Sequence, residues 1–460
     1  MKKTQDKKMK KRSSASNWNH LMKTLVLLLY LFAGIWIFQG MSIASEGKDQ
    51  ILTLQQTIRL ALDVNLNLKT AQEEIQAAEF SRRVARSYFL PAANLSYQYQ
   101  GNDEEFSIPG FGIITPEDKY TFAASVSQPL FSGFSILRRY EASKMGLEVA
   151  QTAEALTRQD VILAAKKAYF TLLRSQKLME VAREAVALGQ NQEEVARQFY
   201  EVGMTPLNDL LKAQVELANA RQGLIAATNS VDVTKANLNT LLRRPVTEPV
   251  NIEDIPDYTS FTAGLNECLK TAEDSRLEIT RAGLEADLAE KDMEIAKKDY
   301  YPSVFLNWTY YQEGTDWDAT GGAGLYSDSS GWNVKAVASW DLWQWGRTHY
   351  GVKERLSRLQ QARHRKAAVL DQIRLEVTDA YLNTVESEKA IVTAQKAIEQ
   401  AKENFRITQE RYKAQMATSL EVFDAQTLLS RAMTNYFGAL YFFKIAKASL
   451  YRAMGQETLE

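Results

Sequence analysis

Four segments of this 460-residue chain alternate apolar and polar side chains with a period of two. The alternation predicts β-strands over residues 92–101, 120–129, 303–312 and 332–341. The apolar positions are rich in aromatic residues: Tyr97, Tyr99, Tyr120, Phe122, Trp308, Tyr310, Trp332 and Trp340. Strands of about ten residues with this pattern are typical of a sheet with lipid on one face and a water-filled lumen on the other. A half-buried hairpin in a water-soluble domain alternates in the same way, so the pattern alone leaves both interpretations open.

Most of the remaining chain has apolar and small residues at helical spacing. The pattern predicts six helices, over residues 52–89, 135–202, 207–242, 262–300, 347–412 and 420–454. No proline interrupts residues 135–202, which would form a rod of roughly 100 Å at the usual rise per residue. Alanine and other small residues along this helix indicate close helix–helix packing rather than one globular core. Gly203 and Pro206 then mark a tight reversal. The second reversal has Gln415 in place of the glycine, which is a weaker signal.

The same elements occur twice in the same order, about 212 residues apart. Ala168-Tyr169 returns as Ala380-Tyr381, and Asp209 returns as Glu421. The chain is therefore expected to form one body from two structural repeats, residues 45–247 and 248–460. Each repeat would hold a β-hairpin and a long α-helical hairpin, which makes the fold class mixed α/β.

The strands cannot complete a membrane structure within one chain. The loops over residues 101–119 and 313–331 are long, polar and rich in glycine, like the external loops of outer-membrane barrels. Four strands are too few to close a barrel, and open sheet edges are not tolerated in lipid. Three copies would supply twelve strands, so the sequence points to an oligomer with cyclic symmetry.

Residues 1–44 have the features of a secretory signal peptide. An apolar run over residues 24–38 follows a lysine-rich stretch, and the small residues Ser42 and Ala44 mark a cleavage site. The alternative is an uncleaved membrane anchor, for which about fifteen apolar residues are short. The segment contains eight Lys/Arg and one Asp, so the mature chain keeps 47 basic and 55 acidic residues, a net charge near −8. Such a balance argues against a nucleic-acid partner, which requires a basic face.

The composition also argues against a bundle of membrane helices and against an enzyme. Charged residues make up 24% of the chain, and the mean hydropathy is −0.32. The single cysteine, Cys268, has no internal disulfide partner. The sequence contains no nucleophile–base pair, phosphate-binding loop or metal-ligand cluster, so we expect no catalysis, no metal and no cofactor.

A series of short motifs, in a fixed order, resembles the TolC family of trimeric outer-membrane efflux proteins over about residues 51–455. The motifs are Leu52-Thr53-Leu54, Leu90-Pro91, Gln128-Pro129-Leu130-Phe131, Tyr200-Glu201-Val202-Gly203-Met204, Asp209-Leu210-Leu211-Lys212-Ala213-Gln214, Tyr301-Pro302 and Met454-Gly455. Each is weak alone, but together they are specific.

The resemblance implies a homotrimer in the outer membrane of a Gram-negative type of envelope. It would form a twelve-stranded β-barrel surrounded by outer-membrane lipid, continued by an α-helical barrel across the periplasm. Such proteins passively export substrates that an inner-membrane transporter delivers through a periplasmic adaptor (membrane fusion) protein. The alternatives are a structural coiled-coil protein of the envelope and a conduit dedicated to polypeptide export.

The resemblance also implies three groups of site residues. The adaptor-contacting tips fall on Val202, Gly203 and Met204, and on Ala414, Gln415 and Met416. The acidic constriction of the periplasmic gate falls on Glu421 and Asp424, and the gate latch on Asp209 and Tyr412. The family's partnering arginine would fall on Ala417, which departs from the pattern. The competing interpretations are ordinary helix-turn packing for the tips and a solvated acidic face for the carboxylates.

Overall fold

The structure is a computed structural model that describes residues 51–322 and 329–457, and the expected signal peptide at residues 1–44 lies outside them. The described chain is mostly helical, with one four-stranded sheet and two small two-stranded sheets. Among these residues no helix is both long and apolar enough to cross a membrane.

The two repeats match helix for helix. The first repeat consists of β1 (Ile51–Leu52), α2 (Leu54–Val64), α3 (Leu66–Ser87), β2 (Ala92–Gly101), β3 (Phe106–Ile108), β4 (Gly112–Thr115), β5 (Asp118–Ser132), α4 (Ser135–Glu201) and α5 (Leu207–Leu241). The second consists of β6 (Asn251–Ile252), α6 (Leu265–Ser275), α7 (Leu277–Ala296), η1 (Lys297–Tyr300), β7 (Ser303–Gly314), β8 (Ser329–Ser339), α8 (Arg347–Lys413) and α9 (Ser419–Ala453). The helices α4 and α8 have 67 residues each, and α5 and α9 have 35 each, so duplication preserved their lengths.

The main sheet is antiparallel in the order β2-β5-β7-β8. Its register aligns Leu95, Ala124, Tyr310 and Trp332 across the four strands. Because side chains alternate along each strand, the apolar positions of all four strands share one face. The other face is polar and holds an ion pair of 2.7 Å between Lys119 and Glu313. Within the described chain β2 and β8 each pair on one side only, so both edges of the sheet are open.

The strand boundaries differ from those expected. β5 runs beyond the expected end at residue 129 to Ser132. Pro129 has no N–H group to donate to the neighbouring strand, and a β-bulge after it allows the pairing with β7 to continue. β8 covers residues 329–339 rather than 332–341, because its pairing ends where Ser339 meets Ser303, the first residue of β7. The short hairpin of β3 and β4, in the loop between β2 and β5, was not predicted.

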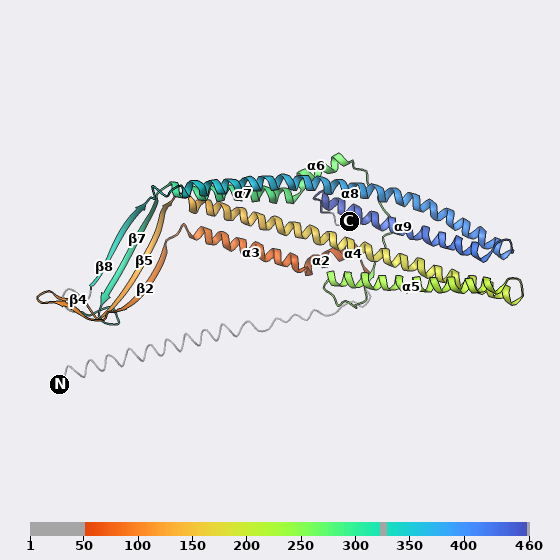
Figure 1. The fold of residues 1–460 in the computed structure, drawn as a ribbon, viewed down its shortest axis with the longest axis horizontal. Coiled ribbons are helices and arrows are strands. Elements are labelled where there is room, and N and C mark those ends of the chain that lie inside the picture. Colours follow the sequence, from red (N-terminus) through yellow and green to blue (C-terminus); the bar gives the residue numbers. More distant parts are fainter. Residues whose placement is uncertain (1–50, 323–328, 458–460) are drawn as a thin grey trace, which may run out of the picture. The chain divides into compact units, whose positions relative to one another are not determined.

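The helices keep the lateral order of the strands to which they connect. Next to the sheet, α3 packs on α4, α4 on α7, and α7 on α8. Farther along, α5 packs on α4, α4 on α9, and α9 on α8. Figure 1 shows α4 with α5 and α8 with α9 as two long antiparallel hairpins. One lateral edge of the chain is therefore formed by β2, α3 and α5, and the other by β8 and α8.

The single helices predicted over residues 52–89 and 262–300 are wrong, because each is divided. The first breaks at Asn65, whose side chain accepts a hydrogen bond of 3.0 Å from the Leu68 amide and so begins α3. The second breaks at Arg276, which is extended and buried. Its guanidinium donates to Glu376 at 2.9 Å and to the Ala453 carbonyl at 3.0 Å. It also donates to Glu278, two residues away, at 2.8 Å. Glu376 and Ala453 are distant in sequence, so the break depends on tertiary contacts as well as on this local one.

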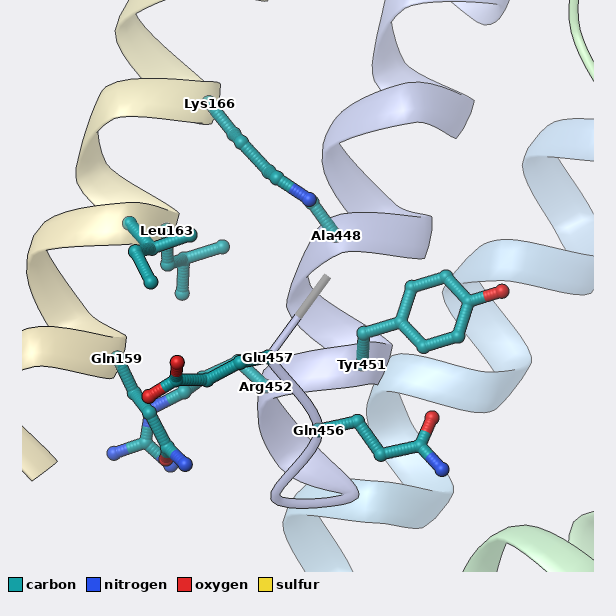
Figure 2. A pocket seen from close by; sticks show the side chains of 9 residues that line it. Gln159, Leu163, Lys166, Ala448, Tyr451, Arg452, Gln456 and Glu457 are labelled. Carbon is teal, nitrogen blue, oxygen red and sulfur yellow. The ribbon is translucent and has the colours of Figure 1, made fainter. Parts of the chain in front are cut away.

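The end of α9 is held by the same network of charges, because Glu278 pairs with both Arg276 and Arg452. Arg452 pairs with Asp160 of α4 at 2.8 Å and with Glu278 of α7 at 2.9 Å. Figure 2 shows Gln159, Leu163 and Lys166 of α4 opposite Ala448 and Arg452 of α9 at a small pocket, with the ring of Tyr451 directed away from α4. The volume of the pocket is about 10 Å³, which is room for one water molecule. The pocket therefore belongs to the packing of the two repeats and is too small for a transported substrate.

The largest apolar core lies where both repeats meet, around β1, β6, α2, α4 and α9. Tyr169 of α4 is fully buried there. Its hydroxyl lies 2.7 Å from the Glu253 carbonyl oxygen and 3.2 Å from that of Leu52. The Leu52 carbonyl also accepts a hydrogen bond from the Glu253 amide, so it would keep a donor without the Tyr169 hydroxyl. The Tyr169 hydroxyl is therefore more important as a donor to the Glu253 carbonyl. This hydroxyl ties the segment between the repeats to the core.

We predict that Tyr169→Phe destabilises the protein by about 0.5–1.5 kcal/mol, because the partly buried hydrogen bond to the Glu253 carbonyl is lost. The matched control is Tyr381→Phe in the second repeat, where the ring contacts Phe261 with centroids 6.4 Å apart. No hydrogen bond of the Tyr381 hydroxyl occurs in the described chain. Thermal unfolding of the detergent-solubilised protein should show a lower midpoint for Tyr169→Phe alone. Equal midpoints for the two variants would contradict the assignment.

Candidate functional site at the helical tips

The two long helices end in the same turn despite different sequences. In the first tip Gly203 is left-handed at φ +73°, and the Met204 amide donates to the Phe199 carbonyl at 2.8 Å. In the second tip Gln415 is left-handed at φ +59°, and the Met416 amide donates to the Arg411 carbonyl at 2.8 Å. Both are helix ends of the Schellman type. Gln415 bears a left-handed cost of about 1–2 kcal/mol that glycine avoids.

The two tips touch each other and expose apolar side chains. The Gln415 Nε2 atom donates to the Met204 sulfur at 3.3 Å, which is a weak hydrogen bond because a thioether is a poor acceptor. Val202, Met204 and Met416 are exposed. The residues expected at the two tips therefore form one patch, in which Met204 and Gln415 are in contact.

Above the tips, Tyr412 is buried at 3% exposure. Its ring contacts Phe199 of α4, with centroids 5.6 Å apart. Its hydroxyl is buried without a hydrogen-bond partner in the described chain. Burial raises the pKa of Tyr412, and the negative charge of Asp209 raises it further. The structure thus brings the two expected latch residues near each other but does not join them by a hydrogen bond.

Glu421 lies in the first turn of α9 and forms a capping box with the N-cap residue Thr418. Its Oε1 atom accepts from the Thr418 amide at 3.1 Å, and the Glu421 amide donates to the Thr418 hydroxyl at 3.3 Å. The backbone and hydroxyl of Thr418 hold the pKa of Glu421 below its usual value, and Arg411 adds to the effect. Asp424 lies nearly one turn farther on, and both carboxylates are on the exposed face of α9. The expected constriction residues thus share one face.

Sequence reasoning missed Thr418 and Arg411. The Thr-x-x-Glu pattern at residues 418–421 is a readable capping box, so the first could have been found. No comparable sequence pattern points to Arg411. It lies 3.7 Å from Glu421 and donates to the Met416 carbonyl at 3.0 Å. It supplies a cation beside the acidic pair, six residues before Ala417, where the family arginine was expected.

The chain has clear relatives. Residues 57–242 and 268–456 match the family model described as "Outer membrane efflux protein", one match in each repeat. The chain is 25% identical over 378 residues to the outer membrane protein TolC of Vibrio cholerae, covering 81% of this chain and 83% of that protein. It is 21% identical over 436 residues to TolC of Escherichia coli, covering 93% and 86%.

A solved structure supports the fold. The outer membrane channel CmeC of Campylobacter jejuni superposes with a TM-score of 0.77 at 17% identity, covering 87% of this chain and 85% of that one. The family consists of channel proteins, not enzymes. The chain therefore belongs to the outer membrane efflux protein family, as an outer-membrane channel that extends into the periplasm.

Proposed function

We propose that three copies of this chain form a continuous conduit, with a twelve-stranded barrel in the outer membrane and an α-helical barrel below it. The observation that carries the proposal is the sheet itself. It has an apolar aromatic face, a polar face with an ion pair, and two open edges at β2 and β8. Lipid cannot satisfy the backbone groups of open edges, so an adjacent copy must pair with them.

The helical edges support the same arrangement. On the edge of α5, Val215, Ile225 and Val233 are exposed. On the edge of α8, Leu375 and Leu382 are exposed. Neighbouring copies in a ring would bring the α8 edge of one against the α3 and α5 edge of the next. Burial of these side chains between two copies would be favourable.

The conduit is proposed to work with two partners. An inner-membrane transporter delivers the substrate, and a periplasmic adaptor binds the tips of this chain. The exposed Val202, Met204 and Met416 support tip binding, because exposed apolar groups at a turn favour association with a partner. The chain itself needs no energy source, since export through an open tube is passive.

The gate is proposed to lie just above the tips. Threefold symmetry would multiply Glu421 and Asp424 into six carboxylates around the narrow end of the tube. Such a ring attracts cations and repels anions. Arg411 and Thr418 hold Glu421 on the exposed face of α9 and so orient one carboxylate of each pair.

We predict that Glu421→Gln combined with Asp424→Asn strongly reduces the preference for cations. Glutamine retains the capping-box geometry while removing the charge. The measurement is the reversal potential of purified trimers in a planar bilayer under a salt gradient. Asp232→Asn, an exposed site in α5 far from the tips, is the matched control. A reversal potential unchanged from wild type would contradict the assignment of Glu421 and Asp424 to the constriction. Absence of any discrete conductance would contradict the proposal that the trimer is a channel.

We predict that Asp209→Ala raises the open probability of the channel. In the proposed closed assembly Tyr412 donates to Asp209, and a hydrogen bond to a charged group contributes about 1.5–3 kcal/mol. Its loss would raise the ratio of open to closed channels by about tenfold or more. Tyr412→Phe should have the same effect, because it removes the donor but keeps the ring against Phe199. If the open probability of Tyr412→Phe equals that of wild type, Tyr412 serves only in packing and the proposed latch does not exist.

We predict that a cysteine in place of Met204 crosslinks to the periplasmic adaptor in cells that express the transporter. Native Cys268 is fully buried and should not react. Thr228→Cys is the control, because it is exposed on α5 and lies roughly 35 Å along the helix from the tip. Met416→Cys tests the second tip. Equal crosslinking at Thr228 and Met204 would argue against tip-specific binding.

A further inference from the structure

A cavity lies beside the connector between the two repeats, residues 253–261, where this segment passes α4 and α9. Its volume is about 240 Å³, roughly that of eight water molecules. It adjoins the smaller pocket of Figure 2 and shares Lys166, Ala448 and Tyr451 with it. We call it the connector cavity, and its lining includes Lys166, Phe170, Tyr258, Phe443, Lys444 and Lys447.

Three lysine side chains line the connector cavity. Lys166 of α4 and Lys444 of α9 are buried, at 3% and 9% exposure, and Lys447 lies nearly one turn beyond Lys444. Buried lysines are rare, because it is costly to remove an ammonium group from water. The duplication does not account for them. The positions that match Lys166 and Lys444 in the other repeat are Thr378 of α8 and Asp232 of α5.

The ammonium group of Lys444 is held by neutral groups. It donates to the Ile255 carbonyl and, at 2.6 Å, to the Asp257 carbonyl. It also lies over the ring of Phe170, 5.7 Å from the centroid. An ammonium group has three donors, and no third acceptor for Lys444 occurs in the described chain. One N–H group therefore remains for a ligand in the cavity.

The charge of Lys444 is only partly balanced. Burial, together with the nearby charge of Lys447, lowers the pKa of Lys444 to about 8. Asp254 and Asp257 oppose this pKa shift but do not cancel it. The Asp254 carboxylate is also engaged elsewhere, because it pairs with Lys177 at 2.8 Å. An anion in the cavity would therefore complete the balance of charge.

The walls beside these lysines are aromatic. Phe170 lies beneath Lys444, and Phe443 lies beneath Lys447 with 5.9 Å between the ammonium and the centroid. Tyr258 of the connector contacts Phe443 edge to face, with centroids 5.3 Å apart. Aromatic rings associate favourably beyond the area they bury. A few polar groups among apolar walls are typical of a small-molecule site, and these walls suit a flat, apolar body.

We propose that the connector cavity binds a small organic anion with an aromatic body, of which an aromatic carboxylate is the simplest form. Lys444 donates its third N–H to the carboxylate, and the rings of Phe170, Phe443 and Tyr258 contact the body. The bound ligand joins the connector to α4 and α9, and so stabilises the joint between the repeats. The site lies within one chain and does not depend on the proposed ring or conduit.

The test measures binding of 2-naphthoate to the full protein by equilibrium dialysis. The detergent concentration is the same on both sides, so that micelles take up the probe equally. The neutral isostere 2-naphthamide has the same rings without the charge. We expect saturable binding of 2-naphthoate and about tenfold or weaker binding of the amide. No saturable binding of 2-naphthoate, or equal affinity for the amide, would overturn the proposal.

The variant Lys444→Met removes the ammonium group and keeps an unbranched side chain. It should weaken the binding of 2-naphthoate by about tenfold or more, because a charged hydrogen bond is lost. Lys235→Met is the matched control. Lys235 is half-buried on α5 at the position that matches Lys447, and it lies outside the cavity. It should bind like wild type. Wild-type affinity in Lys444→Met would show that Lys444 does not bind the anion.

If Lys444→Met does not fold, the wild-type protein decides. Acetic anhydride acetylates lysine side chains, and mass spectrometry gives the rate at each one. We expect 2-naphthoate to slow the acetylation of Lys444 severalfold and to leave that of Lys144, exposed on α4, unchanged. An unchanged rate at Lys444, or equal slowing at both lysines, would overturn the assignment.

Discussion

In the proposed trimer, the rest of the structure depends on the need to pair every backbone N–H and C=O group of a sheet that lipid surrounds. Within one chain, β2 and β8 each leave an edge unpaired. The helices continue the order of the strands, so α3 and α5 follow the β2 edge and α8 follows the β8 edge. Pairing the strands of adjacent copies therefore also brings their helical edges together. In that trimer, closure of the barrel and closure of the helical wall would be one event.

Local patterns in the sequence predicted the parts of the fold that local physics determines. Period-two alternation identified the four main strands and which residues share a face, and helical spacing identified the long helices. The break at Arg276 was out of reach, because its partners Glu376 and Ala453 lie far along the chain. The break at Asn65 could have been read, since asparagine favours a helix N-cap over a helix interior.

In the candidate site too, some features follow from local sequence and others depend on tertiary contacts. Gly203 marked the first tip, but Gln415 adopts the same left-handed turn without a glycine signal. The duplication was therefore a better guide to the second tip than its local sequence. The roles of Arg411 and the unpaired hydroxyl of Tyr412 depend on the packing of four helix ends, which no single segment encodes. The sequence could name the residues proposed for the gate but could not say how they are paired.

The differences between the repeats suggest how such a gate can move. The second tip is firmly built, because Thr418 and Glu421 cap α9 and Arg411 joins the end of α8 to its start. The first tip lacks a side-chain cap, since α5 follows Pro206. Between the two tips there is a weak contact of Met204 with Gln415, and just above it the ring contact of Phe199 with Tyr412. A small buried cluster of Ala196, Leu210, Ala213 and Phe423 also joins the two hairpins near this end. We infer that the hairpins separate at this end at a lower cost than at the main core. The core around Tyr169 would stay closed, because the apolar contacts there are far more extensive.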